Sequence, residues 1–184
     1  MNLNQSIQRY AVVLAMIAIA VASRLLPHPP NFTPLAAMCL FAGAVTVTPR
    51  LIAAAVVVAM LISDAVIGFH GLMPAVYAAL LANFVIGQKL VGQNAGALRV
   101  VGGSLLGSVS FFLVTNFAVW IAVYPSTMTG LAACFTAAIP FFQYTLAGDL
   151  LYSGLFFGVF ALVANREQSA LRTKLAMQPA RIAE

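Results

Sequence analysis

Three side chains suited to binding a small molecule recur at four-residue intervals: Asn116, Trp120 and Tyr124. On a helix this spacing places them on one face. An amide that faced lipid would lack hydrogen-bond partners, so we expect this face to point into a helix bundle. A few polar groups among aromatic and apolar walls are typical of a small-molecule site. Trp120 and Tyr124 fit the aromatic belt of a membrane interface equally well.

Further polar residues are expected near the same end of the bundle. Gln143 and Tyr144 open the last predicted helix, Asn31 lies in a proline-rich loop, and His70 lies in a loop with two glycines. A helix-packing role for Gln143 and a solvated loop position for His70 are the alternatives. The predicted substrate-binding residues are Asn31, Asp64, His70, Asn116, Trp120, Tyr124, Gln143 and Tyr144.

Charged residues at membrane depth need a partner or a purpose, because a central charge costs about 2.5–3.5 kcal/mol. Asp64 and Arg24 are expected at similar depth, which predicts an ion pair; a ligand contact by Asp64 is compatible with that pair. Asp149 is expected closer to the middle of the membrane, where Asn83 is placed to hydrogen-bond it. A neutral, protonated carboxyl or a proton relay are the other interpretations of Asp149.

Reactive constellations are missing from the sequence. There is no GxSxG or HExxH motif and no glycine-rich phosphate loop, so we expect neither an enzyme nor ATP hydrolysis by this chain. Cys39 and Cys134 are predicted to be buried thiols, since no CxxC motif or Cys/His cluster accompanies them. We therefore expect no metal site and no cofactor.

The composition indicates a chain that lies mostly in a membrane. Of 184 residues, 62% are hydrophobic and 7% charged, whereas soluble domains carry about 25% charged residues. A membrane span takes about 20 apolar residues, so the chain has room for about six spans and no separate soluble domain. We predict a single all-α domain over residues 1–165, followed by a basic, partly disordered tail at 166–184. Helices are expected at about 7–26, 35–48, 51–67, 72–90, 99–122 and 139–164, with Pro140 separating a short interfacial helix at 131–138.

The basic residues indicate an orientation. Six crossings put all but Arg24 on one side, and cytoplasmic segments collect Lys and Arg. This distribution predicts a multi-pass protein of the bacterial cytoplasmic (inner) membrane with both termini in the cytoplasm. Contact with anionic lipid headgroups, not nucleic acid, accounts for the net charge of +5. The basic residues placed on the cytoplasmic side are Arg9, Arg50, Lys89, Arg99, Arg166, Arg172, Lys174 and Arg181.

Several segments resemble a known family over about residues 20 to 160. They are Arg24 to Pro34, Leu40 to Ala44, Ser63-Asp64, Phe111 to Trp120, Tyr124-Pro125 and Ile139 to Phe142. They are similar to an uncharacterised bacterial family of six-helix membrane proteins to which a transport role is ascribed. That family in turn resembles the substrate-binding S components of energy-coupling factor transporters.

The resemblance implies partners as well as a fold. S components capture vitamins or related molecules on the outer face and work with a transmembrane coupling subunit and ATPases. Their first helix often carries an Ala-xxx-Ala face for the coupling subunit, so Ala11, Ala15, Ala18 and Ala22 are the candidate residues for such a face. Small residues at this spacing allow close helix approach.

Two functions of different classes follow from the sequence. The first is a transport protein that binds a small molecule, such as a vitamin or its precursor, from the outer face. The second is a structural or assembly protein whose polar residues only join helices. The sequence leaves open the substrate, the energy source and the oligomeric state.

Overall fold

The computed structural model describes residues 18–45, 49–93 and 95–176. In these ranges the chain forms helices joined by short turns and no strand. A first helix occupies residues 18–25 of the described chain. The elements that follow are α2 (Leu35–Val45), α3 (Pro49–Ile67), α4 (Met73–Ile86), the π-helix η1 (Gly87–Val91), α5 (Ala97–Val123) and α6 (Met128–Ala176).

Four helical segments of the described chain are long and apolar enough to cross a membrane. They are Arg50–Ile67, Met73–Val91, Ala97–Val123 and Met128–Leu162. By contrast, α2 has only 11 residues, which is about 17 Å at 1.5 Å per residue. This length covers little more than half of a hydrocarbon core of about 30 Å. The described chain is therefore an all-helical protein with four candidate membrane spans and one short apolar helix.

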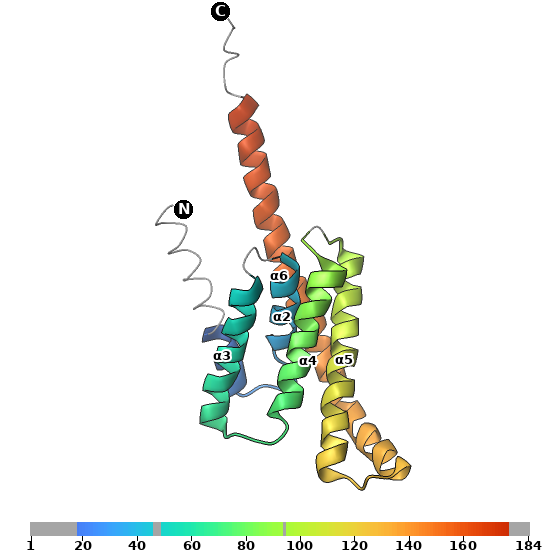
Figure 1. The fold of residues 1–184 in the computed structure, drawn as a ribbon. Coiled ribbons are helices and arrows are strands. Elements are labelled where there is room, and N and C mark those ends of the chain that lie inside the picture. Colours follow the sequence, from blue (N-terminus) through green and yellow to red (C-terminus); the bar gives the residue numbers. More distant parts are fainter. Residues whose placement is uncertain (1–17, 46–48, 94, 177–184) are drawn as a thin grey trace, which may run out of the picture.

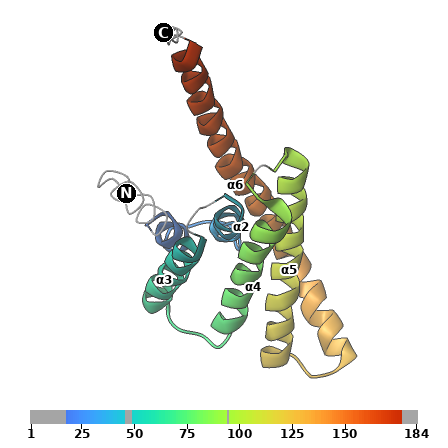
Figure 2. The ribbon, with the colours of Figure 1, turned by 45° about the horizontal axis from the view of Figure 1, so that its top comes forward.

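The long helices run alternately up and down the bundle (Figure 1). The turns from α3 to α4 and from α5 to α6 lie at one end, which we call the turn end. The link from η1 to α5 and the last part of α6 lie at the opposite end, and the view in Figure 2 agrees with this arrangement. In Figure 1, α2 occupies only the part of the bundle away from the turn end.

Small residues hold α2 against α4 and η1. A Cβ added at Gly43 would overlap the backbone carbonyl oxygen of Phe84, and one added at Gly87 would overlap that of Leu40. Such close backbone approach is how small residues pack helices where lipid supplies no hydrophobic driving force. The glycines thus let α2, short as it is, sit in the middle of the bundle.

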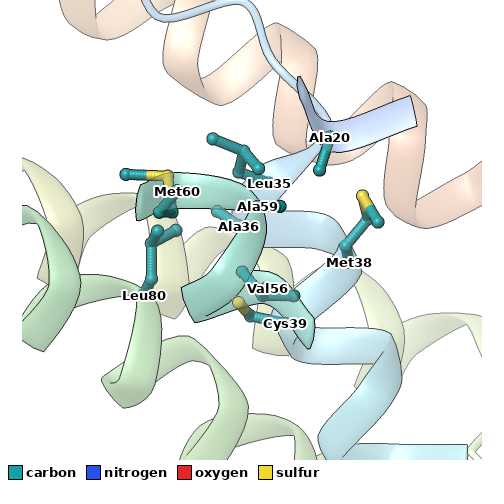
Figure 3. Packing of buried hydrophobic residues seen from close by; sticks show 9 residues of the cluster. All are labelled: Ala20, Leu35, Ala36, Met38, Cys39, Val56, Ala59, Met60 and Leu80. Carbon is teal, nitrogen blue, oxygen red and sulfur yellow. The ribbon is translucent and has the colours of Figure 1, made fainter. Parts of the chain in front are cut away.

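The core around α2 is formed by side chains from four helices. Figure 3 shows them converging from residues 18–25, α2, α3 and α4. All are at most 6% exposed, so this cluster forms a buried core between these helices. The cluster consists of Ala20, Leu35, Ala36, Met38, Cys39, Val56, Ala59, Met60 and Leu80.

The helix positions expected from the sequence agree with α3, α4 with η1, and α5 to within a few residues. The expected first helix, at 7–26, is described only from residue 18. The expected second helix, at 35–48, ends at Val45, and residues 46–48 lie outside the described ranges.

The prediction of two separate helices around Pro140 is wrong. Residues 131–138 and 139–164 belong to one helix, and Pro140 lies inside it. A proline removes one backbone hydrogen bond and bends a helix, but the surrounding helix persists where no water competes for the remaining backbone groups. The ribbon of α6 changes direction within its first half (Figure 1).

Only part of the C-terminal tail predicted at 166–184 is described. α6 continues through residues 166–176 as helix, while residues 177–184 lie outside the described chain. Leu, Ala, Arg, Lys and Gln are all good helix formers, so a basic sequence here is compatible with a continued helix.

Candidate functional site

An ion pair joins the first helix to α3. Arg24 Nη2 lies 2.6 Å from Asp64 Oδ1, with side chains 15% and 1% exposed. Arg24 Nη1 donates to Ser63 Oγ at 2.6 Å and to the Met60 carbonyl oxygen at 3.2 Å. Tyr77 of α4 donates its hydroxyl to Asp64 Oδ2 at 2.6 Å. The predicted ion pair is confirmed, and the network ties three helices together.

One oxygen of this network depends on charge alone. Asp64 Oδ1 is buried and accepts no hydrogen bond of good geometry, although Arg24 Nη2 is only 2.6 Å away. The short distance suffices for a strong attraction, because attraction between opposite charges needs no fixed direction. The Arg24 charge is therefore what compensates the buried carboxylate.

Two adjoining cavities lie beside this network. The first has a volume of about 290 Å³ and the second about 350 Å³. They share four lining residues, Asn31, Val76, Phe111 and Thr145, so we treat them together as one cleft. Asn31 and His28, which are exposed, line it; the cleft is therefore open to the surroundings at that point.

The shortness of α2 explains where the cleft forms. The first cavity is bordered by the start of α2, at Leu35 and Ala36, and by the segment that precedes it. Between the start of α2 and the turn end the bundle has no central helix, and side chains of α3 to α6 border the space instead. Along α5 the lining runs from Phe111 to Tyr124, about 20 Å of helix. The cleft therefore extends from the inner start of α2 to the turn end.

Three of the eight predicted binding residues line the cleft: Asn31, Asn116 and Tyr124. Asn31 adopts a left-handed backbone conformation with φ of 61°, which Asn tolerates better than most residues. Asn116 donates its side-chain amide to the Phe112 carbonyl oxygen at 2.8 Å. The structure thus brings together residues from the first loop and from α5 that are far apart in the sequence.

The other five predicted binding residues are not among the residues that line the cleft. Asp64 lies behind Arg24 in the ion pair. Trp120 donates its indole N–H to the Pro125 carbonyl oxygen at 3.0 Å, which closes the turn after α5. His70, Gln143 and Tyr144 are exposed.

Aromatic rings form one wall of the second cavity. Phe112 of α5 and Phe142 of α6 both line it, with their ring centroids 4.7 Å apart. Phe135 of α6, outside the lining, packs behind Phe112 with its ring centroid 5.6 Å away. Phe111 and Phe141 also line this cavity. Rings at these separations pack favourably against one another and leave an apolar face for a ligand.

Two lining residues, Thr145 and Asp149, were not among the predicted binding residues. Phe141, Thr145 and Asp149 recur every four residues on α6, and all three line the cleft. This periodicity is the same signal that pointed to Asn116 and Tyr124 on α5. The signal was present in the sequence, because all three residues lie within the helix predicted at 139–164.

The predicted hydrogen bond between Asn83 and Asp149 is wrong. Asn83 donates to the carbonyl oxygens of Ala79, at 3.1 Å, and Gly107, at 3.4 Å. A Cβ at Gly107 would overlap Asn83 Oδ1, so the missing side chain is what lets the amide approach α5. Asp149 instead accepts a hydrogen bond from Ser108 Oγ at 2.7 Å.

Cys39 and Cys134 are free and buried, as predicted. Cys134 lines the second cavity, and its thiol donates to the Asn116 backbone oxygen at 3.4 Å. Over the described ranges, no three His, Cys, Asp or Glu side chains gather closely enough to hold a metal ion.

The alanines predicted to face a partner helix are described only in part. Ala18 and Ala22 are exposed, whereas Ala20 between them is 1% exposed and packs in the core. Ala11 and Ala15 lie outside the described residues.

Fold and site together define a class: an all-helical protein with four candidate membrane spans around an internal cleft. The chain belongs to the Family of unknown function (DUF6580), which matches residues 4–172. This agrees with the uncharacterised family that the sequence resembles. Neither a curated protein nor a solved structure matches the chain.

Proposed function

We propose that this protein is the substrate-binding component of a membrane transport system and takes a small molecule into the cleft. The observation that carries the proposal is the cleft itself. Its two parts, about 290 Å³ and 350 Å³, fall in the size range of small-molecule sites, roughly 300–1,000 Å³. Apolar and aromatic walls with a few amides and hydroxyls are the composition such sites have.

The orientation of the cleft supports uptake from outside. Arg50 at the start of α3, Lys89 in η1 and Arg99 at the start of α5 are all at the end opposite the turn end. Basic residues favour the cytoplasmic side, which supports an orientation with the turn end and the mouth of the cleft on the outer face. The proposal includes six crossings of a bacterial inner membrane with both termini in the cytoplasm. Four of them are the candidate spans of the described chain, and α2, with 11 residues, makes a further crossing only together with the segment that precedes it.

The proposal assigns binding, and not catalysis, to the cleft. Cys134 is the only thiol among its described lining residues, and its hydrogen-bond partner is a backbone oxygen rather than a base. Energy for transport would come from separate partners. By the resemblance of its sequence to S components, these are a coupling subunit and ATPases.

Ligand-dependent thermal stability in detergent tests the proposal. The purified protein is heated with each member of a panel of vitamins, nucleobases and their precursors. A ligand that binds only the folded state stabilises it by about 2.7 kcal/mol at a hundredfold excess over its dissociation constant. Asn116→Ala should lose most of this stabilisation, whereas Gln143→Ala, which removes an exposed amide outside the cleft lining, should retain it.

Two outcomes would contradict the proposal. One is the absence of any stabilising ligand for protein that unfolds cooperatively. The other is an equal loss of stabilisation in the Asn116→Ala and Gln143→Ala variants, because binding would then not depend on the cleft.

A structural or assembly protein is the second candidate. The observation in its favour is the network of Arg24, Ser63, Asp64 and Tyr77, in which the polar groups satisfy one another across helices. This function predicts that substitutions in the network lower stability while no small molecule raises it.

A further inference from the structure

The charges that border the cleft are not balanced. Its described lining includes one arginine, Arg24, and one carboxylate, Asp149. Arg24 is compensated by Asp64 at 2.6 Å. Asp149 has no cationic partner within ion-pair distance in the described chain. The cleft therefore holds one carboxyl group that has no cationic partner in the described chain.

Asp149 is also short of hydrogen bonds. It is 3% exposed, and among the described residues its one hydrogen-bond partner is Ser108. The Ser108 hydroxyl has a single hydrogen and two acceptors in reach, the Ser104 carbonyl oxygen at 3.0 Å and Asp149 Oδ2 at 2.7 Å. A carboxylate has about four acceptor positions, so most of those on Asp149 are unused.

The unused positions are accessible from the cleft. Asp149 Oδ1 accepts no hydrogen bond from the described residues. Among those residues, Asp64 Oδ1 is the one side-chain atom that lacks a hydrogen bond and is also fully enclosed. Asp149 Oδ1 is therefore not fully enclosed. Asp149 lines the first cavity, which accounts for this residual access. Thr145, one helical turn from Asp149, lines both cavities. It therefore lies where the cavity beside the carboxyl adjoins the cavity with the aromatic wall.

The histidine at the mouth of the cleft, His28, does not supply the missing partner. His28 lines the first cavity but is exposed, and its Nδ1 lies 2.7 Å from the Leu26 carbonyl oxygen. Its polar contact is therefore within its own loop.

We infer that the cleft selects an organic cation with an aromatic or apolar body, bound through its positive group to Asp149. A positively charged donor would supply both the charge and the hydrogen bonds that this carboxyl lacks, and charge-assisted hydrogen bonds are about twice as strong as neutral ones. The body of the ligand would extend past Thr145 to the rings of Phe111 and Phe112. This inference rests on the proposed function and adds the substrate class.

Three probes that differ in charge test the inference. Tryptamine, tryptophol and indole-3-acetate carry the same indole ring on a two-carbon side chain, ending in an ammonium, a hydroxyl or a carboxylate. Each is titrated calorimetrically into the purified protein, into Asp149→Asn and into Asn116→Ala. Asparagine keeps the shape of the side chain and an acceptor for Ser108, so it removes chiefly the charge.

We expect the wild-type protein to bind tryptamine about tenfold or more tightly than tryptophol, and indole-3-acetate least. Asp149→Asn should remove this preference and leave tryptophol binding unchanged. Asn116→Ala should weaken the binding of tryptamine and of tryptophol to a similar extent and retain the preference for tryptamine. The order of affinities in the wild type tests the inference even if the Asp149 variant does not fold.

The inference is overturned if tryptophol or indole-3-acetate binds the wild type as tightly as tryptamine, or if tryptamine does not bind. It is also overturned if a folded Asp149→Asn variant keeps the preference. In each case the proposed function stands as long as a ligand from the vitamin and nucleobase panel binds in an Asn116-dependent way. Failure of that panel as well would overturn both.

Discussion

Arg24 Nη2 and Asp64 Oδ1 lie 2.6 Å apart and link the end of the first helix to α3. Of the two residues, Arg24 lines the cleft and Asp64 does not. One consequence is structural, because the pair positions the segment that carries Asn31. The other is electrostatic, because Asp64 removes the positive charge that Arg24 would otherwise present to a ligand.

Breaking the ion pair should destabilise the fold strongly. Asp64→Asn leaves Arg24 without its charge partner, and removal of one member of a buried pair costs about 3–5 kcal/mol. The double variant Arg24→Gln/Asp64→Asn should lose less than the sum of the two single losses. Titration with a denaturing detergent measures the free energy of unfolding of the wild type, the two single variants and the double variant. Strictly additive losses would show that Arg24 and Asp64 are not energetically coupled.

The glycine contact between α2 and α4 should not tolerate a methyl group. Gly43→Ala is expected to lower the free energy of unfolding by about 1–3 kcal/mol, because the added Cβ meets the Phe84 backbone, which cannot rotate away. Gly102→Ala on α5 is the matched control, since nothing lies within 4 Å of a Cβ there. Equal stabilities of the two variants in the same titration would contradict the close packing of α2.

The two cysteines should differ in reactivity toward N-ethylmaleimide. Cys134 borders a cavity of about 350 Å³, whereas Cys39 borders one of about 10 Å³, too small for the reagent. Intact-protein mass spectrometry of the Cys39→Ala and Cys134→Ala variants gives the rate for each remaining thiol. We expect Cys134 to react several-fold faster, and similar rates for both thiols would show that the second cavity is closed to solutes.

The exposed alanines of the first helix test the partner assignment. Ala22→Trp should abolish co-purification with a coupling subunit and leave ligand binding in the cleft unchanged, because Ala22 is exposed and outside the cleft lining. Leu98→Trp is the control, since Leu98 is 86% exposed on α5. Retained co-purification of the Ala22 variant would remove the alanine face from the proposal.

Part of the site could be predicted from helical periodicity. The four-residue spacing of Asn116 and Tyr124 marks one face of α5 whichever helix lies opposite, so the sequence suffices for these two residues. Trp120 shares the spacing but turns to Pro125 at the end of α5. A side chain near a helix end has a second choice of partner, the following turn, which periodicity does not reveal.

By itself, the sequence determined the helical class, the spans of α3, α4 with η1, and α5, and the pairing of Arg24 with Asp64. These follow from local hydrophobicity and from the cost of an unpaired charge at membrane depth, which act along the chain without reference to the fold. Only the tertiary structure decided the partners of Asn83 and Asp149, the unbroken helix through Pro140 and the cleft below α2. These depend on how closely helix backbones approach, as at Gly107 and Gly43, and that distance is set by residues far apart in the sequence.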